Sequence, residues 1–137
     1  MKRGHRTRLG TFIGNHMVAA GALVLFLAAC AIPSEQWQTK RMRVTAYCPC
    51  TKCCGENAAG VTACGHRIRP GDNLVAADPR YTFGTEMIIA GYNDGKPVKV
   101  LDRGGAIKGD RLDVFFHSHR QALEWGVRYI EVKVLTK

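Results

Sequence analysis

The stretch Val100-Leu-Asp-Arg-Gly-Gly-Ala-Ile-Lys-Gly-Asp-Arg-Leu-Asp-Val-Phe-Phe116 joins two apolar segments through a glycine-rich turn, and so predicts a strand, a turn and a second strand. Asp102 lies in the first apolar segment and Asp113 lies inside the second. A carboxylate among apolar strand residues costs free energy unless it is paired or used in a reaction. Because both carboxylates flank the same turn, the pattern indicates a functional site rather than a solvated surface.

The rest of the pattern predicts a mainly β fold, because apolar and polar residues alternate in several short segments. We expect six strands, at 43–47, 74–77, 87–92, 97–101, 112–116 and 129–135. One helix is expected after Ser118, which can form a capping box with Gln121, and Gly126 ends it. Six short strands with glycine at the corners favour a small closed six-stranded barrel with one short helix.

The N-terminal segment has the pattern of a secretory signal. Residues 1–29 combine a basic head with an apolar run that is too short to cross a bilayer. The tetrapeptide that ends at Cys30 resembles a lipobox, which predicts cleavage before Cys30 and lipidation of that cysteine; a plain signal peptide or an N-terminal anchor is the alternative. We expect residues 30–40 to be a polar tether and residues 41–137 to be one domain in the cell envelope. An alanine rather than an aspartate after the cysteine favours the outer membrane, facing the periplasm.

The net charge narrows the choice of partner. The chain of 137 residues has a formal charge of +9, and residues 30–137 keep sixteen of the twenty Lys and Arg and all eleven acids, which leaves +5. These charges are dispersed, without the basic stripe and interleaved aromatics of a nucleic-acid surface, so we expect no nucleic-acid partner. An anionic polymer outside the membrane, such as cell-wall glycan with its peptide carboxylates, fits better.

The motif Asp102-Arg-Gly-Gly-Ala-Ile-Lys-Gly109 followed by Asp113 resembles the three-aspartate (3D) domain family. This family includes the C-terminal domain of membrane-bound lytic transglycosylase A and small stationary-phase survival proteins. The resemblance extends over most of residues 44–134, including Val75-Ala-Ala-Asp78 and Ala122-Leu-Glu-Trp-Gly126. It implies a double-psi β-barrel that cleaves the β-1,4 bond between N-acetylmuramic acid and N-acetylglucosamine in peptidoglycan. We expect a monomer without a cofactor.

The resemblance also implies roles for particular residues. The catalytic acid of the family is the aspartate that follows the Gly-Gly-Ala-Ile-Lys-Gly core, which is Asp113 in this chain. The chemistry agrees, because a carboxylic acid is the usual proton donor to a glycosidic oxygen and apolar neighbours raise its pKa. Asp102 would be the second carboxylate of the site. The positions expected to contact the glycan are Asp78, Gly104, Gly105 and Lys108. For Lys108, a solvated lysine in a turn is the alternative.

A binding module is the main alternative to an enzyme. The larger transglycosylase has a second β-domain that forms the other wall of the substrate groove, and residues 41–137 are too few to supply it. Binding of peptidoglycan or loosening of the wall without cleavage therefore stays open. The expected barrel resembles that of expansins and barwin proteins, which need not cleave their polymer.

Five cysteines follow Cys30, and they are Cys48, Cys50, Cys53, Cys54 and Cys64. Outside the cytoplasm disulfides are the default, although five cysteines leave one thiol over. Four thiolates can instead hold a structural zinc ion, and both alternatives stay open. Catalysis by a cysteine is disfavoured because His66 is the only base close in sequence. His117 and His119 flank the helix start, where we expect them to face solvent or cap the helix rather than bind metal.

Overall fold

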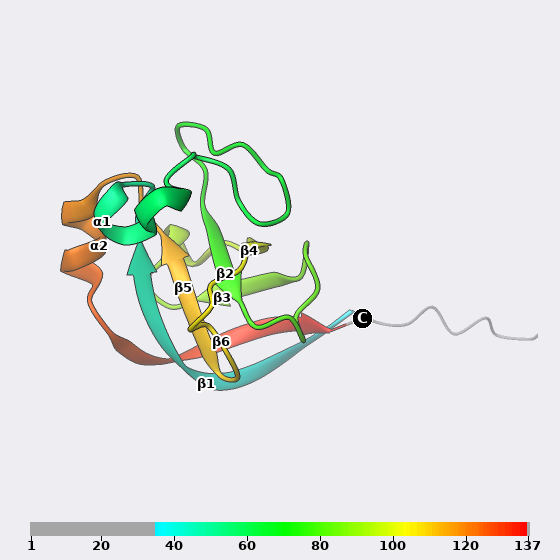
Figure 1. Cartoon of the computed structure of the whole chain (residues 1–137). Coiled ribbons are helices and arrows are strands. Elements are labelled where there is room, and N and C mark those ends of the chain that lie inside the picture. Colours follow the sequence, from blue (N-terminus) through cyan, green and yellow to red (C-terminus); the bar gives the residue numbers. More distant parts are fainter. Residues whose placement is uncertain (1–34, 137) are drawn as a thin grey trace, which may run out of the picture. The chain divides into compact units, whose positions relative to one another are not determined.

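The computed structural model describes residues 35–136, where six strands pair in a closed order, β1-β5-β2-β4-β3-β6 (Figure 1). The strands are β1 (Gln36–Tyr47), β2 (Leu74–Ala77), β3 (Glu86–Ile89), β4 (Val98–Asp102), β5 (Arg111–Phe115) and β6 (Arg128–Thr136). The prediction of a mainly β fold with six strands is therefore confirmed. Two of the neighbouring pairs, β1 with β5 and β2 with β4, run parallel, and the other pairs are antiparallel.

The predicted helix is α2 (His119–Trp125), and its ends follow the local signals. The Ser118 hydroxyl accepts a bond from the Gln121 backbone N–H at 3.3 Å and donates to the Gln121 side chain at 2.9 Å. Gly126 ends the helix with φ of 65°, a conformation that favours glycine. Three shorter helical turns are α1 (Thr51–Cys54), η1 (Gly55–Asn57) and η2 (Asn93–Gly95). Within residues 35–136, no helix has the length and apolarity needed to cross a membrane.

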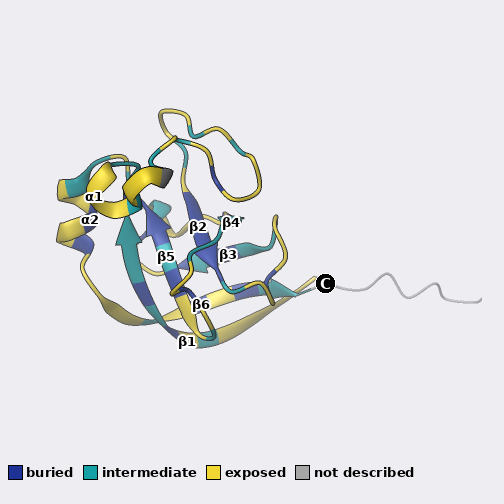
Figure 2. Ribbon diagram, viewed as in Figure 1, coloured by how far each residue is buried: buried dark blue, intermediate teal, exposed yellow. Residues whose placement is uncertain are grey.

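The core is made by strand residues that point to the inside of the ring. On β5, Leu112 and Val114 are both 0% exposed, and Asp113 between them points to the opposite face because strand side chains alternate. Figure 2 shows the buried stretches concentrated on β2 and β5. Burial of each such Leu or Val side chain stabilises the fold by about 1.5–3 kcal/mol. A carboxylate on the outer face of the same strand thus sits on a rigid support.

The first strand is longer than the sequence predicts. β1 begins at Gln36, and residues 36–40 pair in antiparallel register with β6. The expectation of a tether over residues 30–40 is therefore wrong for residues 36–40, and the domain starts before the expected boundary at residue 41. The expected signal peptide at 1–29 and the expected lipidation site at Cys30 lie outside the described residues.

Candidate active site

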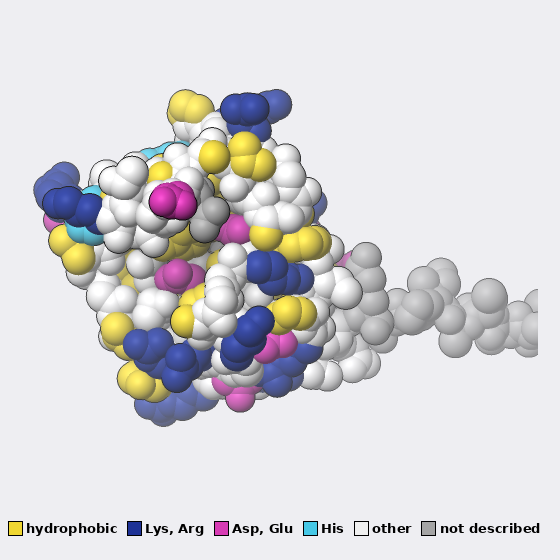
Figure 3. Space-filling view, viewed as in Figure 1, with side chains coloured by type: hydrophobic (Ala, Val, Ile, Leu, Met, Phe, Trp, Pro, Cys, Tyr) yellow, Lys and Arg dark blue, Asp and Glu magenta, His cyan; other side chains and the backbone are white. Residues whose placement is uncertain are grey.

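A cavity of about 480 Å³ lies beside the end of β1, where the loop after α1 meets the β4–β5 turn. Both aspartates of the opening motif, Asp102 and Asp113, line this cavity. The other lining residues are Tyr47, Pro49, Cys53, Cys54, Ala58, Gly60, Val61, Thr62, Ala63, Ile68, Ala76, Arg103, Gly104 and Gly105. In the space-filling view, acidic side chains lie among hydrophobic ones in the hollow below the loop that follows α1 (Figure 3). The fold therefore brings the two predicted carboxylates into one site.

Asp113 lies in the middle of β5, where its register partners are Thr45 on β1 and Ala76 on β2. The Thr45 hydroxyl donates to Asp113 Oδ1 at 2.8 Å. Burial raises the pKa of Asp113 from its usual 3.8 to about 6, against the lowering effect of the Thr45 hydrogen bond. The negative charge of Asp102 also raises this pKa, and the Arg43 guanidinium lowers it. Asp113 thus keeps its proton at a pH where an ordinary aspartate is ionised.

Asp102 ends β4 and is held by three hydrogen-bond donors. The Tyr47 hydroxyl donates to Oδ2 at 2.6 Å, and the backbone N–H groups of Ala63 and Arg103 donate to Oδ1, each at 2.8 Å. Bonds from donors to a charged acceptor are stronger than neutral ones and fix the position of the carboxylate. The Ala63 bond also ties the loop after α1 to the end of β4. The two carboxyl groups therefore differ in environment, since Asp113 is shielded from solvent and Asp102 accepts three hydrogen bonds.

The outer face of β1 supplies polar side chains to this site. Thr45 and Tyr47 alternate with buried residues such as Val44, which is 0% exposed. Burial raises the pKa of Tyr47 well above its usual 10, and the hydrogen bond to Asp102 raises it further. The phenol therefore stays protonated and remains a donor. The sequence alone does not single out Thr45 and Tyr47 as site residues; their signal is a strand with polar side chains at every second position.

Two glycines of the β4–β5 turn, Gly104 and Gly105, line the cavity, and they differ in what surrounds them. A Cβ atom at Gly104 would lie 2.7 Å from Cγ1 of Ile107, which is 8% exposed. A Cβ atom at Gly105 would meet nothing within 4 Å. Gly104 is therefore required by packing, whereas Gly105 leaves the backbone open to a ligand in the cavity.

Two residues that we expected to contact substrate lie elsewhere. Asp78 is not among the residues that line the cavity, and its carboxylate accepts bonds from the backbone N–H groups of Arg80 at 2.9 Å and Gly109 at 2.8 Å. These two bonds lower the pKa of Asp78, as in a carboxylate that stabilises turns. Lys108 is exposed and borders a separate shallow hollow beside Arg111. The expectation that Asp78 and Lys108 belong to the same groove is therefore not supported.

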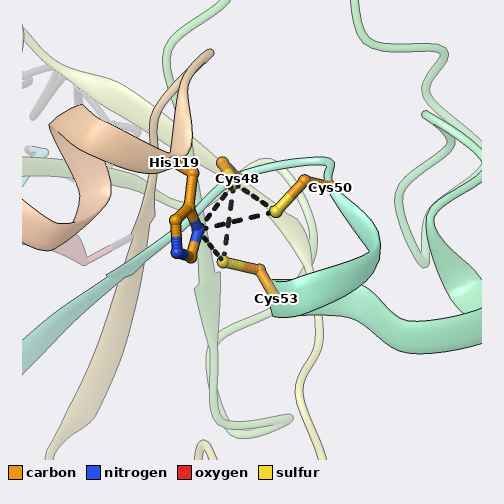
Figure 4. A group of neighbouring side chains, drawn as sticks. All are labelled: Cys48, Cys50, Cys53 and His119. Carbon is orange, nitrogen blue, oxygen red and sulfur yellow. Dashed lines mark hydrogen bonds between the residues drawn. The ribbon is translucent and has the colours of Figure 1, made fainter.

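The cysteines divide into groups. The sulfur atoms of Cys48, Cys50 and Cys53 converge on Nδ1 of His119, and these four atoms all lie within 4.8 Å of one another (Figure 4). The prediction that His119 faces solvent or caps its helix rather than approaching a metal site is therefore wrong. Cys54 instead donates to the backbone carbonyl of Cys48 at 3.2 Å. The four-residue cluster is a set of side chains that could hold a metal ion.

The remaining cysteine and histidines have other partners. Cys64 lies 3.3 Å from the Thr62 hydroxyl. His66 pairs with Asp72 at 2.8 Å, a contact that orders the loop before β2. His117 is exposed, as predicted, and its ring and that of Phe115 lie nearly perpendicular, with their centroids 5.0 Å apart.

Comparison with known proteins finds relatives linked to the cell wall. The cell wall-binding protein YocH of Bacillus subtilis (strain 168) is 39% identical over 80 residues, which cover 56% of this chain and 27% of YocH. YabE of the same organism, provisionally named a cell wall shaping protein, is 34% identical over 93 residues, which cover 66% of this chain and 21% of YabE. This chain thus spans about a quarter of the length of the curated relatives that it matches.

One solved structure and one family model complete the comparison. The crystal structure of MltA from E. coli aligns with a TM-score of 0.44 and 24% identity, covering 56% of this chain and 27% of that one. The family model described as "3D domain" matches residues 73–136, which include Asp78, Asp102 and Asp113. The resemblance that the motifs indicated is confirmed, because residues 73–136 match the 3D domain model.

Proposed function

We propose that this chain is a peptidoglycan lytic transglycosylase. It cleaves the β-1,4 bond between N-acetylmuramic acid and N-acetylglucosamine and leaves a 1,6-anhydro-N-acetylmuramic acid end. The observation that carries this proposal is one cavity that contains both a carboxyl group with a pKa of about 6 and a carboxylate fixed by three donors. These are Asp113 and Asp102, respectively. The match of residues 73–136 to the 3D domain model supports the same activity.

In this proposal, Asp113 acts first as an acid and then as a base. Its proton passes to the glycosidic oxygen while the bond from that oxygen to C1 of the muramic acid breaks. The C6 hydroxyl of the same muramic acid then attacks C1, and the proton of that hydroxyl passes to the Asp113 carboxylate. The carboxyl group is thereby restored and no water enters the product. One sheltered carboxyl group is therefore sufficient, and a second base to activate water is not needed.

The role of Asp102 is electrostatic. Positive charge develops at C1 in the transition state, and a carboxylate that is already held in place stabilises this charge without further reorganisation. Its bond from Tyr47 keeps the carboxylate oriented, and its charge also favours the protonated form of Asp113. The open backbone at Gly105 gives the glycan a surface that it can approach closely.

The fold and the location belong to the same proposal. We infer a double-psi β-barrel, which the two parallel strand pairs support. Residues 1–29 would direct secretion, and lipidation at Cys30 would hold a monomeric domain at the outer membrane, facing the periplasm. The lipobox-like sequence that ends at Cys30 supports this anchor. Incorporation of radiolabelled palmitate, lost in Cys30→Ala, is the expected result.

Binding without cleavage is the second candidate, because the relative with 39% identity is named a cell wall-binding protein. This candidate is a peptidoglycan-binding or wall-loosening module of expansin-like or barwin-like fold. It uses the same cavity without proton transfer, so the two candidates differ in whether a soluble product is released.

The test is digestion of purified sacculi by the parent chain and by Asp113→Asn. We expect the parent to release anhydromuropeptides, and the variant to sediment with sacculi as well as the parent does while releasing none. The matched control is Asp94→Asn, a change of the same chemistry at an exposed turn residue with φ of 53°. Sedimentation of the parent without any released product supports the binding module instead. Equal digestion by parent and Asp113→Asn contradicts the assignment of the acid.

A further inference from the structure

A metal-ligand set lies next to the candidate active site, formed by segments that are distant in sequence. Cys48 follows β1, Cys50 and Cys53 bracket the start of α1, and His119 is the first residue of α2. Figure 4 shows the ring nitrogen of His119 pointing at the three sulfur atoms. Its distances to the sulfurs of Cys48, Cys50 and Cys53 are 3.7, 3.5 and 3.4 Å.

We propose that Cys48, Cys50, Cys53 and His119 bind one Zn²⁺ ion in a tetrahedral, structural site. Bonds of about 2.3 Å to sulfur and about 2.0–2.1 Å to nitrogen in a tetrahedron separate sulfur from nitrogen by about 3.6 Å. The three distances from His119 agree with that separation. The sulfur of Cys48 lies 3.0 Å from that of Cys50 and 3.5 Å from that of Cys53, where the tetrahedron requires about 3.8 Å. A small outward shift of the cysteines therefore completes the site.

The backbone at Cys50 folds back so that two of the cysteines come close together. The N–H groups of Cys53 and Cys54 both bond the carbonyl of Cys50, at 3.0 and 2.9 Å, which closes a tight turn around that residue. This turn brings the sulfurs of Cys50 and Cys53 within 4.8 Å of each other, where both can bind one zinc ion as thiolates.

A disulfide explains the geometry less well. A disulfide would join two of the three sulfurs at about 2.05 Å, leave the third unpaired and give the ring of His119 no part. Four protein ligands that fill a tetrahedron leave no position for water, which is the pattern of a structural rather than a catalytic zinc site. Cys48 is buried, Cys50 and His119 are half-buried and Cys53 is exposed, so one side of the site packs against the domain and the other side faces solvent. The cysteine ligands lie outside residues 73–136, which match the family model.

The metal would hold a wall of the cavity in place. Pro49 and Cys53, together with the neighbouring Cys54, line the cavity that contains Asp113. This wall has little packing of its own, because none of the residues of α1 is buried. Zinc would tie it to the start of α2, more than sixty residues away in sequence.

The test is the zinc content of the full chain, purified without chelators and measured by mass spectrometry of the metal. We expect one zinc ion per chain in the parent and in the controls Cys64→Ser and His117→Ala, and its loss in His119→Ala and Cys50→Ser. All five cysteines after Cys30 should titrate as thiols after unfolding with a chelator. The proposal is overturned if zinc persists in His119→Ala. It is also overturned if the parent holds no metal and two of its thiols are missing, as in a disulfide.

Replacement of zinc by cobalt in the parent chain keeps the test decisive if the ligand variants do not fold. Cobalt held by three thiolates and one imidazole in a tetrahedron absorbs strongly in the visible range and shows sulfur-to-metal charge transfer in the near ultraviolet. We expect this spectrum to appear with one equivalent of cobalt and to vanish on addition of zinc. A pale octahedral spectrum, or none, contradicts the site. These readouts do not depend on cleavage of peptidoglycan, so they are independent of the proposed function.

Discussion

Replacement of Asp113 by asparagine should stabilise the protein at neutral pH while it removes the proposed catalytic acid. Asparagine has the same shape, and its Oδ1 can still accept the bond that Thr45 donates to Asp113 at 2.8 Å. What it removes is a carboxyl group whose charged form is disfavoured by burial and by the charge of Asp102. The variant therefore isolates the free-energy cost of keeping this carboxyl group charged in the folded state.

The size of the effect follows from the pKa of Asp113. The folded value is about 6 and the usual value is 3.8, and this difference corresponds to about 3 kcal/mol. Because the folded chain binds the proton more tightly than the unfolded chain, the free energy of unfolding of the parent falls as pH rises from about 4 to about 7. The variant lacks this group. We therefore expect the stability of Asp113→Asn relative to the parent to increase by about 3 kcal/mol across that range.

The assay is urea denaturation of both proteins at a series of pH values, with the variant-minus-parent difference in unfolding free energy plotted against pH. Other titrating groups, such as Asp72 and Asp78, whose pKa values are lowered, contribute equally to both proteins and cancel. The control Asp94→Asn should give a difference that does not rise in this way. A flat difference for Asp113→Asn would refute the conclusion that its carboxyl group is sheltered.

Three further substitutions test the surroundings of the carboxylates. Tyr47→Phe removes a hydroxyl that donates at 2.6 Å to the part-buried carboxylate of Asp102. The free energy of unfolding in urea should drop by about 1–3 kcal/mol and cleavage should slow. No change in either quantity contradicts the assigned bond. Thr45→Val removes a hydrogen bond that lowers the pKa of Asp113. In a pH–rate profile, the pH at which cleavage declines should therefore move upward. An unchanged profile argues against an effect of Thr45 on the pKa of Asp113. Gly104→Ala forces a contact of 2.7 Å with Ile107 and should destabilise the protein by about 1–3 kcal/mol. Gly105→Ala should change stability by under about 0.5 kcal/mol. Equal denaturation midpoints for the two variants would contradict the tight packing at Gly104.

Local patterns were sufficient to predict most of the elements. The strand around Asp113 follows from Leu112 and Val114, whose alternation with the acid puts the two apolar side chains inside and the carboxylate outside. The cap of α2 follows equally from Ser118 and Gln121. In these places a few neighbouring residues carry the whole signal, because the interaction itself is local.

Contacts between distant segments could not be predicted in this way. His119 meets the cysteines only because β1 and β5 lie parallel and end at the same edge of the sheet, and no local pattern encodes that pairing. The first half of β1 is polar and resembles a linker, yet residues 36–40 pair with β6 through backbone bonds that need no apolar side chains. Asp78 resembles a site residue in sequence, but its carboxylate accepts hydrogen bonds from two backbone N–H groups.

The most direct test of the central claim is digestion of sacculi in water labelled with a heavy isotope of oxygen. If Asp113 transfers its proton and the C6 hydroxyl attacks, the released muropeptides end in an anhydro sugar and carry none of the label. Labelled, hydrated sugar ends would show that water is the nucleophile and would contradict a lytic transglycosylase.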